Sequence, residues 1–156
     1  MSSASFPPPA LAQIAQEVAS LLKSRKETLS VAETAAGGLV SAAILATPGA
    51  SQVFRGGLTL YTLESRIAFA GWTQDDVKKY GGPTPESGTA GPTASGKTQN
   101  RQPGYVALAV SGGPKGTVSK DLNTDCGNDR TKNMVAFAVE ALKLVKEVIS
   151  GDEAKI

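Results

Sequence analysis

The 156-residue chain is 40% hydrophobic and 19% charged, which is enough apolar material for one compact domain with a core. Its 16 basic and 14 acidic residues give a formal net charge of +2, a balance that argues against nucleic acid or an anionic membrane as the main partner. Histidine is absent, which excludes Ser-His-Asp hydrolysis and most transition-metal sites, and the single cysteine, Cys126, cannot form an intrachain disulfide.

The chain begins with a stretch that has no features of a targeting segment. Residues 1–9 end in Pro7-Pro8-Pro9, and we expect them to form a disordered or extended lead before a single domain at residues 10–150 and a polar tail at 151–156. The lead has no basic or apolar run typical of a secretory signal, and no later apolar run approaches the roughly 20 residues that cross a bilayer. With the lone cysteine, these features predict a cytoplasmic protein.

The first half of the domain predicts a helix, a strand, a turn and a second helix in that order. Apolar residues from Leu11 to Leu22 recur at helical spacing, and Thr28–Glu33 has the composition of a short strand. Gly37 and Gly38 permit a tight turn, and the small apolar residues 39–46 predict a helix that stops before Pro48-Gly49. A strand, a glycine turn and a helix in succession point backbone N–H groups at an anion.

The remaining elements are two short helices, three strands and a long helix. We expect a strand at 54–61, helices at 64–70 and 75–80, a long loop at 81–103, a hairpin of strands 105–110 and 117–122, and a last helix capped by Asn128 or Asp129 that runs to about Ile149. The loop has almost no apolar residues, and loops of this length in compact domains are usually functional or disordered.

A match to the P-loop pattern lies inside that loop, at Gly91–Thr98. A P-loop requires a buried strand before it and a helix after it, and here prolines and glycines stand on both sides. We therefore reject a P-loop nucleotide hydrolase. A phosphate contact through Lys97 or Arg101 stays open beside the alternative of a solvated surface loop.

Several short segments in a fixed order carry a more specific signal. They are Ala32-Glu33-Thr34-Ala35-Ala36-Gly37-Gly38, Pro48-Gly49-Ala50-Ser51, Phe54-Arg55-Gly56-Gly57-Leu58-Thr59-Leu60-Tyr61, Gly88-Thr89-Ala90-Gly91-Pro92, Pro103-Gly104-Tyr105-Val106 and Asn128-Asp129-Arg130. Together, from about Leu11 to Val148, they resemble the CinA C-terminal family of nicotinamide-nucleotide amidases. The resemblance implies an α/β fold, a three-layer α/β/α sandwich with a mixed sheet that is shortened in the middle here.

The resemblance also implies a reaction and a set of site residues. Family enzymes convert nicotinamide mononucleotide and water to nicotinic acid mononucleotide and ammonia, without a metal or other cofactor. Their nucleophilic serine falls on Thr34, their tyrosine on Tyr61 and their lysine on Arg66. The implied substrate-binding residues are Glu33, Gly37, Gly38, Ser87, Gly88, Thr89 and Arg130.

Three substitutions separate this chain from the family pattern. A threonine hydroxyl is a competent nucleophile whose methyl group restricts its approach. Arginine stays protonated at physiological pH, so Arg66 cannot be a general base, although it can clamp a phosphate or carboxylate. Ala36 replaces a family threonine. Each of the three implied catalytic residues has alternative roles. Thr34 is a nucleophile, a hydrogen-bond partner of a ligand or a helix cap. Arg66 contacts a ligand or forms a surface ion pair with Glu64 or Glu33, and Tyr61 is a site residue or a half-buried strand aromatic.

Family members also carry a helix and a buried strand, roughly 20 residues, where this chain passes directly from Glu86 to Ser87. The loss of a central strand exposes apolar edges unless another segment or subunit fills the gap, so we expect a homo-oligomer. Two functions stay open: a metal-independent amidase that acts on a pyridine nucleotide, and a non-hydrolytic relative that binds a small molecule or serves other chemistry. Arg130 is expected in the site because a cation at a helix N-terminus opposes the helix dipole.

Overall fold

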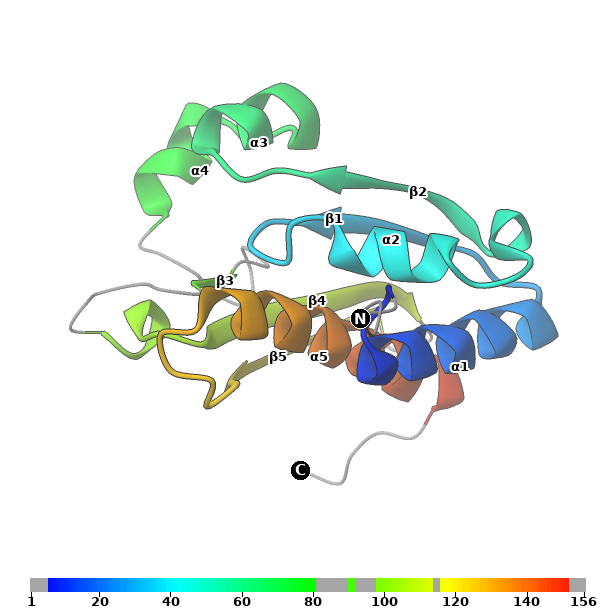
Figure 1. Ribbon diagram of the computed structural model, residues 1–156. Coiled ribbons are helices and arrows are strands. Elements are labelled where there is room, and N and C mark those ends of the chain that lie inside the picture. The colour runs from blue at the N-terminus through cyan, green and yellow to red at the C-terminus, as the bar shows by residue number, and fades with distance from the viewer. Residues whose placement is uncertain (1–5, 81–89, 92–97, 114–115, 152–156) are drawn as a thin grey trace.

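The computed structural model describes residues 6–80, 90–91, 98–113 and 116–151. Two short 3₁₀ turns, Ala50–Gln52 and Gln99–Arg101, accompany the main elements. These elements are α1 (Pro9–Arg25), β1 (Leu29–Glu33), α2 (Leu39–Leu45), β2 (Phe54–Thr59), α3 (Leu63–Ala70), α4 (Gln74–Lys79), β3 (Ala90–Gly91), β4 (Tyr105–Gly113), β5 (Gly116–Asn123) and α5 (Arg130–Ser150) (Figure 1).

The helices and strands expected from the sequence form, with small shifts at their ends. Helix α1 begins at Pro9, one residue inside the expected lead, because the first helical position requires no backbone N–H. Asp129, rather than Asn128, caps α5, and its carboxylate accepts a hydrogen bond from the Lys132 backbone N–H at 3.0 Å. That bond lowers the pKa of the Asp129 carboxyl below its ordinary value. Most of the expected loop at 81–103 lies outside the described residues.

Within the described residues the strands form two separate sheets rather than the single mixed sheet that we expected. Strands β1 and β2 are parallel, with Val31 opposite Gly57. Strands β3, β4 and β5 form an antiparallel sheet in which β4 lies in the middle and Val110 faces Val118. The fold is therefore mixed α/β, and its strands are divided between two small sheets.

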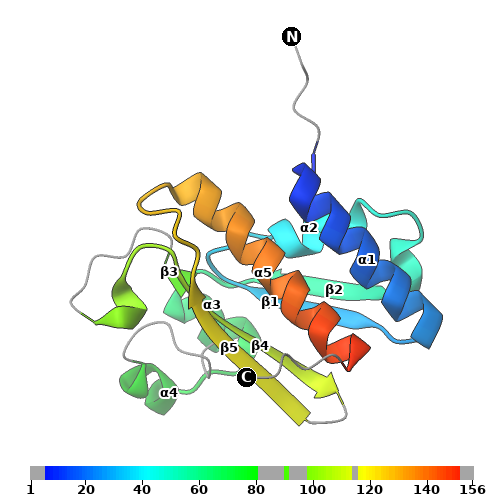
Figure 2. The same ribbon diagram turned by 90° about the horizontal axis from the view of Figure 1, so that it is seen from below.

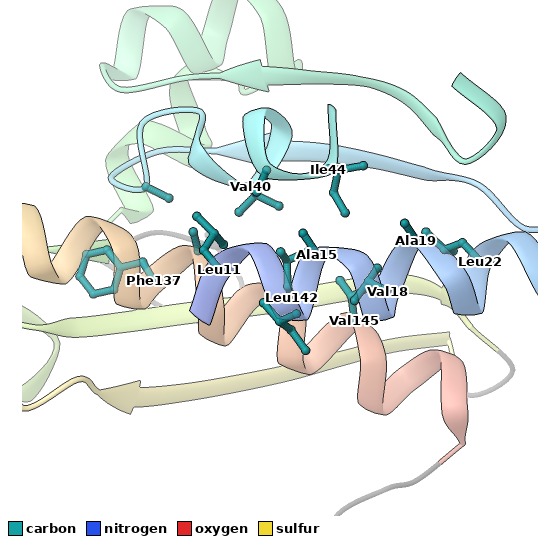
Figure 3. Close-up of a cluster of buried hydrophobic side chains, with 14 of the residues drawn as sticks. Leu11, Ala15, Val18, Ala19, Leu22, Val40, Ile44, Phe137, Leu142 and Val145 are labelled. Atoms are coloured by element: carbon teal, nitrogen blue, oxygen red, sulfur yellow. The ribbon is translucent and has the colours of Figure 1, made fainter. Parts of the chain in front are cut away.

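Three helices bring the apolar core together. Helices α1 and α5 lie side by side, and α5 crosses β4 (Figure 2). Figure 3 shows the side chains that meet between α1, α2 and α5. They include Leu11, Ala15, Val18, Leu22, Val40, Ile44, Phe137, Leu142 and Val145. The spacing of these residues along α1 and α5 is helical, so one stripe of each helix is buried. No helix in the described part of the chain is long and apolar enough to span a membrane.

We expect the Phe137→Ala substitution to destabilise the protein by about 3–5 kcal/mol, because it leaves a cavity in a close-packed core. Phe137 is 1% exposed, whereas Phe69 on α3 is 69% exposed. The Phe69→Ala substitution removes the same atoms from the surface and serves as the matched control. Urea unfolding of the two variants measures the difference, and equal losses of stability would contradict this account of the core.

Candidate ligand-binding site

The turn between β1 and α2 is held by a buried carboxylate. Glu33, the last residue of β1, is 4% exposed. One of its carboxylate oxygens accepts the Val40 backbone N–H at 3.0 Å, and the other accepts the Ser41 backbone N–H at 2.9 Å and the Ser41 hydroxyl at 2.6 Å. These two N–H groups belong to the first turn of α2, where a negative charge is favourable. The Glu33 side chain therefore caps the N-terminus of α2.

This arrangement corrects one expectation about the turn. The strand, glycine turn and helix were expected to direct backbone N–H groups at a bound anion. The chain's own Glu33 carboxylate occupies two of those donors, on Val40 and Ser41. An external anion must therefore be held by other groups.

Gly37 and Gly38 are required by the backbone at this turn. Both have positive φ angles, 68° and 91°, a region that residues with a β-carbon rarely adopt. A β-carbon on Gly37 would lie 2.8 Å from Cε of Met134, and one on Gly38 would lie 3.3 Å from Oγ1 of Thr59. Gly38 also stands at the N-cap of α2, so the alternative that Thr34 caps this helix is wrong.

Arg66 is buried between two aromatic rings. Its side chain lies on α3, is 7% exposed, and its guanidinium carbon is 5.0 Å from the centre of the Trp72 ring and 5.1 Å from that of Tyr80. Its Nε and Nη1 atoms are buried and have no hydrogen-bond partner within the described structure. The alternative of a surface ion pair is therefore wrong.

Local sequence signals explain how the two rings reach Arg66. Gly71 ends α3 in a left-handed conformation, and the Trp72 backbone N–H then donates to the Arg66 carbonyl at 3.3 Å. Thr73 and Asp76 form a capping box that starts α4, and Tyr80 follows the end of that helix. Trp72 and Tyr80 were not expected in the site, because no periodic pattern links them to Arg66.

A cavity of about 320 Å³ contains Arg66 and the end of β1. It lies within the size range of small-molecule sites. Thr34 and Glu33 line it from β1 and the following turn, and Trp72 lines it beside Arg66. Glu33 and Arg66 are the two charged residues among the described residues that line it. The rest of the lining is apolar or small, and most of it comes from β1, β4 and α5, with Ala36, Val40, Leu60 and Ala70 from other segments.

Two other expected site residues meet outside this cavity. Tyr61 is 60% exposed, and its hydroxyl oxygen accepts a hydrogen bond from Nη2 of Arg130 at 3.2 Å. The tertiary structure thus joins two residues that are 69 positions apart in the chain. Tyr61 is a surface aromatic here, not a half-buried one.

The remaining expectations fall outside what the structure describes. Ser87, Gly88 and Thr89 lie beyond the described residues, and so does Lys97 in the P-loop-like segment. Within the described ranges no group of three His, Cys, Asp or Glu residues is arranged to hold a metal ion.

Comparison with known proteins gives a consistent result. The family model described as the CinA C-terminal domain matches residues 11–86. A "CinA-like protein" of Thermotoga maritima is 31% identical over 157 aligned positions, which take in 87% of this chain and 37% of that protein. A "putative competence-damage inducible protein" of Halothermothrix orenii is 38% identical over 102 positions, 64% of this chain and 24% of that protein. The aligned part of the chain thus spans about a quarter to two fifths of the length of these curated relatives.

Solved structures share the fold. The competence/damage inducible protein of Agrobacterium tumefaciens superposes with a TM-score of 0.81 over 92% of this chain and 98% of that chain, at 19% identity. A CinA superfamily protein of Klebsiella pneumoniae gives a TM-score of 0.77 over 90% of this chain and 98% of that chain, at 14% identity. At these identities the likeness concerns the fold alone.

The longer alignment also indicates by how much this chain is short. An alignment of 157 positions that takes in 87% of 156 residues uses about 136 of them, so about 21 positions have no residue of this chain opposite them. The 102-position alignment uses about 100 residues and needs almost no gaps. The missing length agrees with the roughly 20 residues expected from the sequence, and the family match ends at Glu86, where we placed the gap.

We expect Glu33→Ala to destabilise the protein by about 3 kcal/mol and Glu33→Gln by about 2 kcal/mol, because each leaves buried donors of α2 without a charged acceptor. The exposed carboxylate of Glu64 provides the control, and Glu64→Gln should leave stability unchanged. Urea unfolding tests all three variants. Losses below about 0.5 kcal/mol for both Glu33 variants would show that this carboxylate does not hold the turn.

Proposed function

The chain is a divergent member of the CinA family. We propose that its cavity binds an anionic small molecule and that Arg66 holds the anionic group. The first ligand that we propose is a pyridine nucleotide. The observation that carries the proposal is the buried guanidinium whose Nε and Nη1 atoms have no partner within the described structure. A buried charge without hydrogen bonds is costly, and a ligand that supplies an acceptor removes that cost.

The surroundings of Arg66 favour an anion over other ligands. Trp72 and Tyr80 stand over the guanidinium, which holds its plane in place. A phosphate or carboxylate can therefore bind at the edge of the group, where two parallel N–H donors match its oxygens. Glu33 does not compete for this position, because its oxygens accept hydrogen bonds from Val40 and Ser41.

The choice of a pyridine nucleotide rests on the family resemblance, since nicotinamide mononucleotide carries both a phosphate and an aromatic ring. Isothermal titration with this nucleotide and with its phosphate-free riboside tests the proposal. We expect the nucleotide to bind and the riboside to bind about 100-fold more weakly, as the loss of a charge-assisted pair predicts. Equal affinity for the two compounds would contradict a role for an anion.

Substitution of Arg66 separates binding from stability. We expect Arg66→Met to weaken nucleotide binding by about 100-fold while it leaves the unfolding midpoint unchanged or raises it, because it removes an unpaired buried charge. Arg55 on β2 is exposed, and Arg55→Met is the matched control for the loss of one positive charge. Unchanged affinity in Arg66→Met would contradict the proposed anion contact.

Hydrolysis of the nucleotide amide is a second candidate function. The observation that favours it is that Thr34, at the position of the family nucleophile, lines the same cavity as Arg66. Attack by the Thr34 hydroxyl on the amide carbonyl would form an ester and release ammonia, and water would then hydrolyse the ester. The step requires a base to take the hydroxyl proton, and Arg66 cannot serve.

An ammonia assay with nicotinamide mononucleotide tests this candidate. We expect the parent chain to release ammonia slowly. The Arg66→Lys variant should release it at least 10-fold faster, because a desolvated lysine can act as the base. The Thr34→Ala variant, which lacks the nucleophile, should release none. No ammonia from the parent or from Arg66→Lys would reject hydrolysis. That outcome leaves the binding proposal standing, since titration measures it separately.

A further inference from the structure

Helices α3 and α4 have no buried apolar anchor in the domain. Arg66 is the one buried side chain of α3, and α4 has none, although both helices lie wholly within the described residues. The close packing between described elements joins the other helices and the strands, and it involves neither α3 nor α4. Figure 1 shows the two helices set apart from α1 and α2. A segment with so few buried contacts has low local stability.

The hydrogen bonds of residues 62–80 are also local. Thr62 caps α3, and Thr73 forms a capping box with Asp76 at the start of α4. In the described structure, the hydrogen bonds of residues 62–79 all have their second partner within the same segment. The two helices have eight and six residues, and helices of such lengths are marginal in water on their own. Their order therefore depends on the buried side chain of α3.

That buried side chain is a cation without an acceptor. Nε and Nη1 of Arg66 are buried and have no hydrogen-bond partner within the described structure. The rings of Trp72 and Tyr80 lie over the guanidinium, but they belong to the same segment and do not tie it to the rest of the domain. Burial of an unpaired charge is costly, and an opened segment returns the guanidinium to water. The closed arrangement is therefore less stable without an acceptor than with one.

The same segment forms one wall of the cavity. Arg66, Ala70 and Trp72 line the cavity from this segment, and β1, β4 and α5 supply most of the other walls. Opening of the segment removes its wall and gives a ligand access to the space behind it. A ligand that binds only to the closed arrangement shifts the population of the segment toward that arrangement.

From these observations we propose that residues 62–80 are a lid, and that its folding over the cavity is linked to an anion at Arg66. The inference rests on the proposed function, because the anion is the ligand that we assign to the cavity. Without an anion, the lid opens by local unfolding and exposes Arg66 to water. A phosphate or carboxylate on the guanidinium closes the lid and completes the cavity wall. Release of the anion then requires the lid to open again.

Hydrogen exchange of the backbone amides of the full chain tests the lid without a mutation. In the ligand-free chain we expect the amides of α3 and α4 to exchange at least about 100-fold faster than those of α5 near Leu142, which lies in the core. Nicotinamide mononucleotide at about 100 times Kd should slow exchange in α3 and α4 by about 100-fold, because it binds to the closed lid. The last turn of α1 lies far from the lid in Figure 1, and its amides are the unchanged control.

The outcomes of this experiment separate the lid from the binding function. Lid amides that exchange as slowly as those of α5 in the ligand-free chain would overturn the lid. A nucleotide that binds in the titration but leaves exchange in α3 and α4 unchanged would also overturn it, while the proposed function would stand. Absence of binding in the titration would reject the proposed function, and the link between the lid and the buried charge is then decided by substitution of Arg66.

Arg66→Met tests the link to the buried charge with no ligand present. Methionine keeps a favourable contact with both rings, and closure of the lid no longer buries an unpaired cation, so exchange in α3 and α4 should slow by at least about 10-fold. Arg55→Met removes a positive charge from exposed β2 and should leave lid exchange unchanged. Trypsin cleavage after Lys78 and Lys79 of α4 follows the population of the open lid and should slow by the same factor. Unchanged or faster exchange and cleavage in Arg66→Met would contradict the proposal.

Discussion

The hydrogen bonds from Val40 and Ser41 to the Glu33 carboxylate are the interaction on which the site depends. Helix α2 has seven residues and no side-chain cap at Gly38, so little in its own sequence holds its first turn. The carboxylate at the end of β1 supplies the acceptors, and it thereby ties the strand, the glycine turn and the helix into one unit. Thr34 is placed in the cavity as a consequence of that connection.

The same carboxylate decides which group is available to an anion. In a strand–turn–helix unit the helix N-terminus normally offers donors to a ligand. Here two of those donors are used inside the chain, and the buried guanidinium of Arg66 is left without acceptors for two of its nitrogens. The aromatic rings of Trp72 and Tyr80 compensate part of the charge's desolvation. In the binding function that we propose, the local cost in stability and the capacity to bind an anion therefore have one physical origin.

The strands that the structure describes are divided between two sheets, and the helical core packs against both of them. Helix α5 packs on β4, and the core formed by α1, α2 and α5 also takes in residues of both sheets, Val31 of β1 and Val106 of β4 among them. The solved relatives share the overall fold at TM-scores of 0.81 and 0.77. Most of the buried core residues belong to the three helices rather than to the strands, so the core does not require one continuous sheet.

The sequence by itself determined the elements and the family, because helical spacing in α1 and α5, strand composition in β4 and the turn at Gly37-Gly38 are local signals. From the resemblance it also predicted a missing segment of roughly 20 residues after Glu86, and the match to the family model ends at that residue. The tertiary structure alone decided that Glu33 is held by α2, that Arg66 is buried under Trp72 and Tyr80, and that Tyr61 meets Arg130 outside the cavity. Burial and hydrogen-bond partners depend on residues far apart in the chain, and no local pattern records which of them meet.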